Sequence, residues 1–270
     1  VYEQKRKDIQ VVAINGSARG TMETNLHLLK YDSAHGRFDC DIQMGDNEFT
    51  LNGDVIKYYA TRDPQEIPWG ELNVDVVMEC TGSLRSKKSN LTHLEQGAKK
   101  VLISAPGDSD VDATIVYGVN HLNLKKSDRV VSNASCTTNG LAPILHALNQ
   151  KLTIESGLMN TIHSFTNDQA LLDNMHKDIR RARTASSSMV PTKTGAASAI
   201  GLVIPELKGK LDGVAIRVPT TNVSLIDLTL KIKEQVTASE VNEIIKNASE
   251  NELKDILVYS DIPLVSIDFN

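Results

Sequence analysis

Cys136 is the residue of this sequence whose surroundings most clearly favour chemistry. It stands in SNASCTTNG (132–140), between small polar residues and directly after an apolar run. The apolar positions between 141 and 148 have helical spacing, so Cys136 is expected at or beside the start of a helix. Unsatisfied N–H groups and the helix dipole favour an anion there. A thiol in that place has a lowered pKa and a larger fraction of nucleophilic thiolate.

A nucleophilic thiolate needs a base, and His163 is the candidate. It ends the apolar, strand-like part of MNTIHSFTNDQ (159–169), and a Cys–His pair is one form of activated nucleophile. From the residues alone, two alternatives stay open. Cys136 could be a small buried packing residue, as free cysteines often are, and His163 could be structural. The polar neighbours of Cys136 favour the reactive interpretation, whereas Cys80, inside an apolar strand, is expected to be a packing residue.

The first half of the chain has the elements of an α/β domain. Apolar runs alternate with helix-compatible stretches, which is typical of a doubly wound parallel sheet whose strands are buried on both faces. Ligands bind at the carboxyl ends of such strands. The expected strands cover 11–15, 74–82, 99–106 and 129–133, and the expected helices cover 25–32 and 86–98, the latter ended by Gly97.

The second half has a different pattern. Residues 222–233 alternate between apolar and polar side chains, which predicts a strand with one wet face in an antiparallel sheet. Thr237 and Glu240 form a capping-box pair that starts a helix. Pro143 fits the helix after Cys136 if it lies in the first turn. The change of pattern near Cys136 predicts two domains, 1–134 and 135–270.

Composition excludes several function classes. The chain has 270 residues, 23% charged and 4% aromatic, with a net charge of -5 and a pI of about 5.8. This balance argues against nucleic-acid binding, and no apolar run reaches the ~20 residues of a membrane span. Three irregularly spaced cysteines favour a reducing, cytoplasmic setting over a disulfide framework. We expect no partner of either kind, nucleic acid or membrane.

Twelve segments, in order, resemble the phosphorylating glyceraldehyde-3-phosphate dehydrogenase family. The resemblance implies a Rossmann-type doubly wound dinucleotide-binding domain, followed by an α+β catalytic domain with a mainly antiparallel sheet. The segments are KYDSAHGRF (30–38), TRDP (61–64), ECTG (79–82), ISAP (103–106), YGVNH (117–121), SNASCTTN (132–139), HSFTNDQ (163–169), HKDIRRAR (176–183), TGAA (194–197), IPELKGKLDG (204–213), IRVPTTNVS (216–224) and PLVS (263–266).

The resemblance implies a role for each site residue and no metal. Cys136 would attack the aldehyde carbon of D-glyceraldehyde 3-phosphate, and His163 would act as acid and base. Inorganic phosphate would then release 1,3-bisphosphoglycerate from a thioester. Thr166 and Arg217 match the family's substrate-phosphate site. Its attacking-phosphate site is matched by Ser135, Thr137, Thr194 and Gly195.

The resemblance also implies a nicotinamide cofactor, NAD or NADP. NAD-dependent members carry an acidic residue just after AIN, which contacts the adenosine ribose and repels a 2′-phosphate. Gly16 stands there, with Ser17 and Arg19 nearby, which suggests use of NADP. The alternative is that 16–20 is simply a flexible turn. Arg62 and Ser104 match other cofactor contacts of the family, and the loop holding the basic run 176–183 implies a homotetramer.

The sequence departs from the family at both ends. The family begins with a strand and a Gly-rich turn, whereas Val1 to Lys7 here resembles the tail of the first helix. The family also continues beyond VSIDFN, so we expect a chain truncated at both ends. Two other functions stay open: the sister activity of erythrose-4-phosphate dehydrogenase, which Thr166 disfavours, and a non-catalytic binding or regulatory role, which Cys136 and His163 disfavour.

Overall fold

The computed structural model describes residues 1–16 and 19–270 and divides into two compact units. Residues Val1–Leu102 form the first unit and Ile103–Asn270 the second. The boundary between the compact units therefore lies before residue 134, and the functional boundary at 134/135 stays a prediction. Each unit has its own hydrophobic core.

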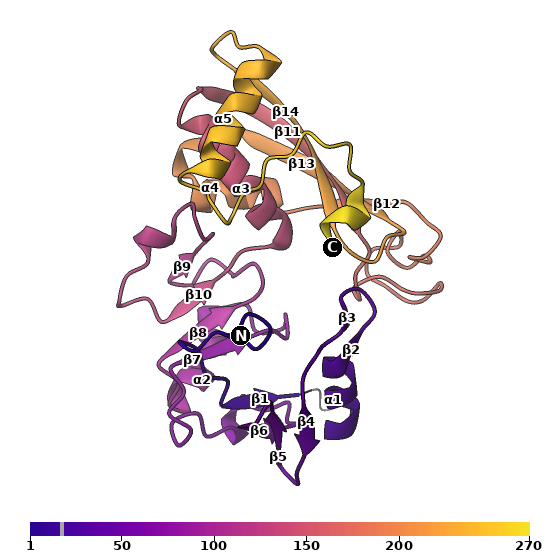
Figure 1. The fold of residues 1–270 in the computed structure, drawn as a ribbon. Coiled ribbons are helices and arrows are strands. Elements are labelled where there is room, and N and C mark those ends of the chain that lie inside the picture. The colour runs from indigo at the N-terminus through magenta and orange to yellow at the C-terminus, as the bar shows by residue number, and fades with distance from the viewer. Residues whose placement is uncertain (17–18) are drawn as a thin grey trace. The chain divides into compact units, whose positions relative to one another are not determined.

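The first unit contains a four-stranded sheet of order β1-β6-β5-β4 (Figure 1). The expected strand 11–15 forms β1 (Ala13–Asn15), which runs parallel to β6 (Asp54–Tyr59). β5 (Glu48–Leu51) and β4 (Ile42–Met44) continue the sheet in antiparallel fashion. The expected helix 25–32 forms α1 (Met22–Lys30), and its Leu26 packs into a core with Phe49 and Ile56. A two-stranded ribbon follows α1, β2 (Tyr31–Asp32) with β3 (Gly36–Arg37).

A second sheet has the order β7-β8-β10-β9. Its strands confirm three further expectations: 74–82 contains β7 (Val76–Glu79), 99–106 contains β8 (Lys100–Ile103), and 129–133 contains β10 (Val130–Ser132). β10 pairs in parallel with the short β9 (Ala113–Thr114). Helix α2 (Lys87–Glu95) begins at its N-cap Ser86 and gives way to Gly97 with φ +101°, a conformation that glycine adopts without strain.

Three local expectations are wrong. Burial on both faces holds for β10 alone, because side chains alternate along β7 and leave Val76 and Met78 exposed. Cys80 is also exposed, since β7 ends one residue before it. The first seven residues form hydrogen-bonded turns, with Arg6 N–H donating to the Val1 carbonyl, where a helix tail was expected.

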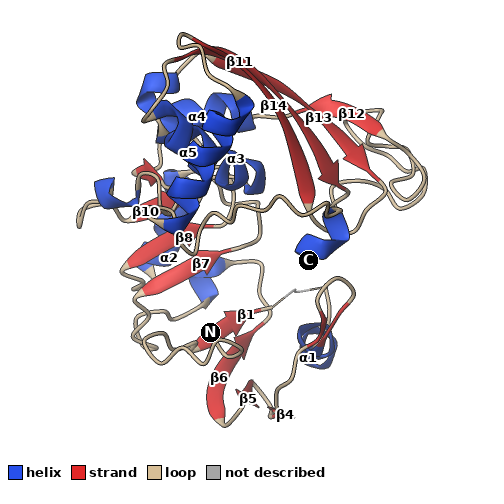
Figure 2. Ribbon diagram, turned by 45° about the horizontal axis from the view of Figure 1, so that its top comes forward, coloured by secondary structure: helices blue, strands red, loops and turns tan. Residues whose placement is uncertain are grey.

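The second unit contains a mixed sheet covered on one face by helices (Figure 2). The order β12-β13-β11-β14 includes one parallel pair, β11 with β13, between two antiparallel pairs. The helices are α3 (Cys136–Asn149), α4 (Ala196–Val203) and α5 (Ala238–Glu250). The strands are β11 (Ile154–Ser164), β12 (Val190–Lys193), β13 (Leu211–Val218) and β14 (Ser224–Ile232).

Local signals account for the elements of this unit. The predicted strand 222–233 contains β14, and Thr237 and Glu240 make the predicted capping box at the start of α5. Leu141 and Leu145 of α3 are fully buried in one core with Ile200 of α4. Pro143 lies inside α3 beyond its first turn, so the condition set for it is not met. The loss of its hydrogen bond is tolerated within a well-packed helix.

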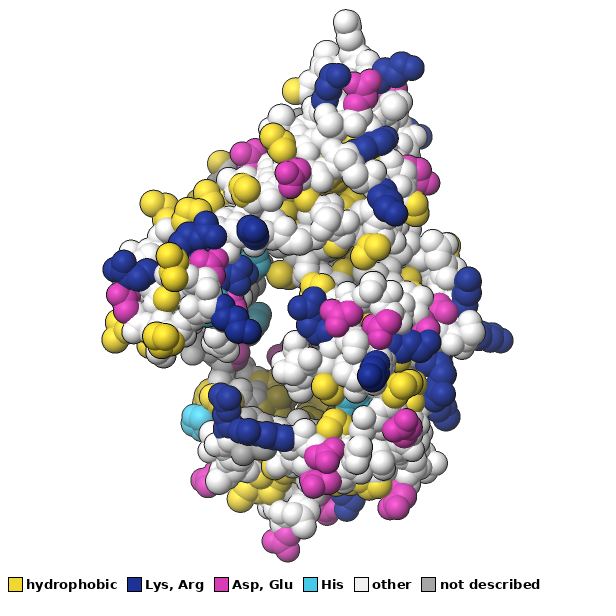
Figure 3. All heavy atoms as spheres, turned by 180° about the vertical axis from the view of Figure 1, so that it is seen from behind, with side chains coloured by type: hydrophobic (Ala, Val, Ile, Leu, Met, Phe, Trp, Pro, Cys, Tyr) yellow, Lys and Arg dark blue, Asp and Glu magenta, His cyan; other side chains and the backbone are white. Residues whose placement is uncertain are grey.

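The molecular surface carries charges of both signs. On the face seen in Figure 3, Lys and Arg side chains are interspersed with Asp and Glu, and hydrophobic side chains are scattered among them. Within residues 1–16 and 19–270, no helix has the length and apolar character to cross a membrane.

We predict that Leu145→Ala lowers the free energy of unfolding by about 2–5 kcal/mol, because it opens a cavity in the core that anchors α3. Leu202→Ala is the matched control: Leu202 is 63% exposed on α4, and its loss changes the stability by less than about 0.5 kcal/mol. Urea unfolding of both variants measures the difference. Equal destabilisation by the two substitutions would contradict this description of the core.

Candidate active site

Cys136 is the first residue of α3, as the sequence predicts. Strand β10 ends at Ser132, and Ser135 is the N-cap, its hydroxyl accepting the Thr138 N–H at 3.1 Å. Ala134 between them has φ +56°, an unusual conformation for a residue with a side chain. The Ser132 hydroxyl accepts the Ala134 N–H at 3.1 Å and holds this tight connection.

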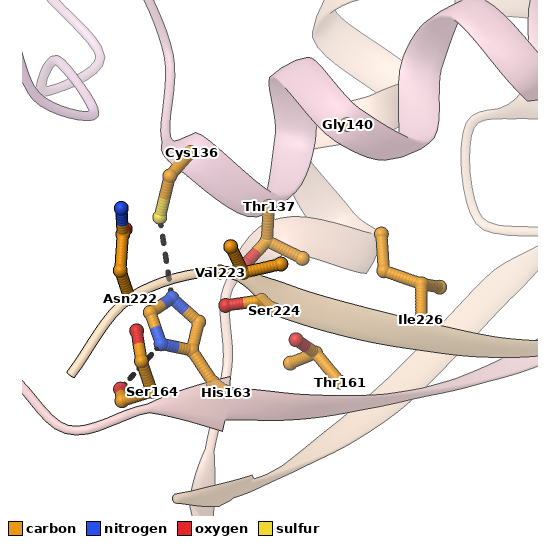
Figure 4. A pocket seen from close by; sticks show the side chains of 10 residues that line it. All are labelled: Cys136, Thr137, Gly140, Thr161, His163, Ser164, Asn222, Val223, Ser224 and Ile226. Atoms are coloured by element: carbon orange, nitrogen blue, oxygen red, sulfur yellow. Dashed lines mark hydrogen bonds between the residues drawn. The ribbon is translucent and has the colours of Figure 1, made fainter. Parts of the chain in front are cut away.

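His163 lies opposite Cys136, near the end of β11 (Figure 4). The Cys136 Sγ atom is 3.3 Å from His163 Nε2. Cys136 as a whole residue is exposed although its thiol is partly covered, whereas His163 is buried and 7% accessible. The predicted Cys–His pair is therefore formed by one residue at a helix start and one on a buried strand.

The other ring nitrogen orients the imidazole. His163 Nδ1 is 2.7 Å from the Ser164 carbonyl oxygen, and since a carbonyl can only accept, Nδ1 carries the proton in this contact. Nε2 is then free to accept the proton of the thiol. The Arg217 Nη1 group donates to the same carbonyl at 3.0 Å, which accounts for its closeness to Nδ1, 3.1 Å.

The pKa of the Cys136 thiol is lowered to about 7. The hydrogen bond with His163 is the largest cause, burial opposes it, and the hydroxyl and N–H of Thr137 contribute further lowering. A substantial fraction of Cys136 is therefore thiolate at neutral pH. The polar sequence around this cysteine, including Thr137, is part of the reason for its reactivity.

Arg217 provides a guanidinium beside the Cys–His pair. β11 and β13 run parallel with His163 in register with Arg217. Arg217 Nη1 also reaches Thr166 Oγ1 at 3.4 Å, so the two residues predicted for a substrate phosphate do lie together. Burial and, to a smaller degree, the charge of Arg181 lower the pKa of Arg217. Its Nε has no hydrogen-bond partner among the residues that the structure describes, as expected for a group that awaits an anion.

The pair opens onto a pocket of about 310 Å³. Residues that sequence reasoning missed form much of its wall. Among them, Thr161 is buried, and its hydroxyl has no partner among residues 1–16 and 19–270. Val223 has φ +68°, a strained conformation for a β-branched residue. Such strain clusters at functional sites. The lining residues are Cys136, Thr137, Gly140, Thr161, His163, Ser164, Asn222, Val223, Ser224 and Ile226.

The residues predicted for a second phosphate are only partly assembled. Thr137 lines the pocket, and Ser135 is engaged as the cap of α3. Thr194 and Gly195 lie at the start of α4, where the Thr194 hydroxyl accepts the Ala196 N–H at 3.2 Å. Neither of these two lines the pocket.

Arg181 is a further functional candidate that the sequence signalled but did not single out. It belongs to the basic run 176–183, and the sequence does not distinguish it from the other basic residues of that run. Its Nε donates to Thr192 Oγ1 at 3.0 Å, and its guanidinium pairs with Asp168. Together with Arg217 it makes this part of the second unit cationic, which suits an anionic substrate.

The cofactor candidates lie at strand ends. Gly16 directly follows β1, and its N–H donates to the Tyr59 carbonyl at 2.8 Å. Asn15 and Thr61 exchange two hydrogen bonds of 3.1 Å, which places Arg62 after the neighbouring strand end. Ser104 is exposed directly after β8. Ser17 lies outside the described residues.

Gly16 is constrained by a neighbouring side chain. A Cβ atom at this position would collide with the Tyr58 ring, 2.4 Å from its Oη. The space beside its Cα atom is therefore occupied by Tyr58, and position 16 accommodates only glycine while that ring stays in place.

Comparisons with known proteins agree with the resemblance. The glyceraldehyde 3-phosphate dehydrogenase C-terminal domain matches residues 135–270, and the NAD binding domain of the same family matches residues 1–87. Glyceraldehyde-3-phosphate dehydrogenase, chromosomal, of Cupriavidus necator is 59% identical over 266 residues, 98% of this chain and 79% of the relative. The enzymes of Zymomonas mobilis (53% over 262 residues; 97% and 77%) and Geobacillus stearothermophilus (52% over 267 residues; 98% and 79%) are also similar.

These matches cover nearly the whole chain, far more than the short motifs around Cys136 and His163. They confirm the expected combination of a dinucleotide-binding domain and a catalytic domain. On this evidence, the chain belongs to the glyceraldehyde-3-phosphate dehydrogenase family.

Proposed function

We propose that this protein oxidises D-glyceraldehyde 3-phosphate to 1,3-bisphosphoglycerate, using inorganic phosphate and NAD or NADP. The observation that carries the proposal is the 3.3 Å contact between Cys136 and His163, with the thiol pKa lowered to about 7. A thiolate of this kind forms a covalent bond with an aldehyde carbon at neutral pH.

The chain's own residues handle the nucleophile and the protons. The Cys136 thiolate adds to the aldehyde carbon, and the carbonyl oxygen takes the proton that His163 Nε2 received from the thiol, which gives the hydroxyl of a hemithioacetal. His163 Nε2 accepts that hydroxyl proton as the carbon is oxidised to a thioester. Acceptance of a hydride from that carbon is the chemistry supplied by a bound nicotinamide nucleotide. Phosphate oxygen then attacks the thioester carbon, and the Cys136 thiolate leaves.

One guanidinium and one hydroxyl group are suited to bind the phosphate of the substrate. Arg217 Nη1 lies 3.4 Å from Thr166 Oγ1, and Arg217 Nε lacks a partner among the described residues. A guanidinium with an open N–H beside a hydroxyl is a good phosphate ligand. For the attacking phosphate we propose Ser135, Thr137, Thr194 and Gly195, which lie at the N-terminal ends of α3 and α4.

For the nucleotide we propose Gly16, Arg62 and Ser104. The absence of a carboxylate at Gly16 supports use of NADP, because nothing at that position repels a 2′-phosphate. Arg19 would add a positive charge nearby.

The assembled protein is proposed to be a cytoplasmic homotetramer with functional domains 1–134 and 135–270. The match of the family's catalytic domain starts at residue 135, which supports this boundary. Leu171, Leu172 and Met175 are exposed on the loop that holds the basic run, which supports a subunit contact there. All three cysteines are free, which fits a reducing compartment.

The activity test follows absorbance at ~340 nm with glyceraldehyde 3-phosphate and phosphate, giving NAD and NADP separately. We expect phosphate-dependent reduction, and a loss of about 10⁴-fold in Cys136→Ser because the covalent route disappears. Cys80→Ser is the matched control and keeps its activity. Folded protein that reduces neither nucleotide would overturn the proposal in favour of a binding role, whereas preference for erythrose 4-phosphate would reassign the substrate.

The reactivity of Cys136 should follow its lowered pKa. We expect alkylation by iodoacetamide to rise with pH around about 7, where half of the thiol is ionised. In His163→Asn the midpoint should move up towards the ordinary value of 9.0, because the main cause of the lowering is gone. Peptide mass analysis separates this site from Cys40, whose pKa is raised by burial. A native midpoint near 9 would contradict the assignment.

Arg217 should distinguish substrates with and without a phosphate. In Arg217→Leu, we expect kcat/KM for glyceraldehyde 3-phosphate to fall about 10- to 100-fold more than that for D-glyceraldehyde, the worth of a charged hydrogen bond. Arg183→Leu, which removes a surface guanidinium paired with Asp173, is the control and leaves the ratio unchanged. An equal fall for both aldehydes would show that Arg217 acts only through His163.

A further inference from the structure

Gly16 has no room for a side chain. Besides the 2.4 Å approach to Tyr58 Oη, a Cβ atom there would lie 2.8 Å from two carbons of the same ring. The backbone of Gly16 is fixed from the other side by its hydrogen bond to the Tyr59 carbonyl. Any side chain at position 16 therefore requires Tyr58 to move.

Tyr58 is held in this place. Asn25 Nδ2 of α1 donates to Tyr58 Oη at 2.9 Å and to the Thr21 carbonyl at 2.9 Å. The half-buried ring also packs against the core around Phe49 and Ile56. Burial raises the pKa of Tyr58, against a smaller opposite effect of the Asn25 hydrogen bond, so the phenol is neutral at neutral pH.

The phenol has one donor left to use. Because Asn25 donates to Oη, the phenolic proton must point elsewhere, and within residues 1–16 and 19–270 no acceptor takes it. A neutral O–H donor beside Gly16 can serve a ribose hydroxyl or a phosphate oxygen. A carboxylate in the same space would accept from the hydroxyl and repel the phosphate.

A cavity beside β6, the strand of Tyr58, has enough space for part of a nucleotide. Tyr58 and Thr61 line a cavity of about 530 Å³ in the first unit. The one carboxylate in its wall, Glu66, is engaged by the Thr61 hydroxyl. Lys57, also in the wall, pairs with Glu48.

We propose that Tyr58, held by Asn25, determines nucleotide selectivity at the adenosine ribose. Its ring excludes a carboxylate from position 16, and its hydroxyl donates to the 2′-oxygen, so that the site accepts a nucleotide with a 2′-phosphate. This inference rests on the nucleotide use proposed above, and adds that Gly16 alone does not set the preference.

Binding of NAD and NADP by isothermal titration calorimetry tests the proposal without depending on catalysis. Native protein is expected to bind NADP at least as tightly as NAD. Gly16→Asp alone should weaken both by about 10-fold or more without a gain for NAD, because the carboxylate collides with the ring. Gly16→Asp with Tyr58→Ser frees that space and should raise the NAD preference about 10-fold over the native protein.

Variants that leave Gly16 intact test the role of Tyr58 independently of the Gly16 substitutions. Tyr58→Phe keeps the ring but removes the donor, and should weaken NADP binding about 10- to 100-fold, the worth of one hydrogen bond to a charged group. Tyr31→Phe, at an exposed position of β2 that does not line this cavity, is the matched control and should not change the NAD to NADP ratio. Melting temperatures identify any variant that fails to fold, and Tyr58→Phe decides the question if Gly16→Asp is such a variant.

Each outcome has one meaning. If native protein binds neither nucleotide, the proposed cofactor use fails and this inference fails with it. If the nucleotides bind but Gly16→Asp alone shifts the preference as far as the double variant, or Tyr58→Phe binds NADP like the native protein, the role of Tyr58 is wrong while the proposed function stands.

Discussion

The rest of the site depends on the contact between the Cys136 thiol and the His163 imidazole. It joins a residue at the start of α3 to one on β11, with a separation of 3.3 Å between Sγ and Nε2. Two features fix that distance. The tight turn through Ala134 sets where α3 begins, and the core contacts of Leu141 and Leu145 set how the helix lies on the sheet. A small displacement of either would separate the two atoms and raise the pKa of the thiol.

The register of β11 and β13 extends this constraint to the substrate. Because His163 and Arg217 occupy equivalent positions on adjacent parallel strands, one carbonyl, that of Ser164, accepts from both side chains. The same oxygen therefore selects the tautomer of the base and positions the guanidinium. The proton acceptor and the proposed phosphate ligand are thus built on one rigid element, which suits a reaction that needs both groups in fixed places.

The sequence predicted the site better where signals are local. The polar residues around Cys136 and the capping pair of Thr237 and Glu240 mark helix starts directly, and both are confirmed. The β5–β6 hairpin is also predictable from sequence: Asn52 and Gly53 both have positive φ, as an Asn-Gly turn requires. Burial of β7 could not be predicted from its sequence, because it depends on what covers each face of the sheet, and the same holds for the exposure of Cys80.

Contacts between residues far apart in the sequence could not be predicted from local sequence patterns. Thr161 and Val223 meet Cys136 in one pocket only because β14 pairs with β11 and brings the turn at Val223 beside His163. The strained φ of Val223 costs roughly 1–3 kcal/mol, and it persists because this pairing fixes the chain on one side of it. Tyr58 beside Gly16 is a similar case. In the sequence Gly16 indicates only the absence of a carboxylate, whereas in the structure the Tyr58 ring also excludes any side chain from that position. The sequence alone shows that position 16 lacks a carboxylate. That Tyr58 fills the space beside Gly16 depends on the pairing of β1 with β6.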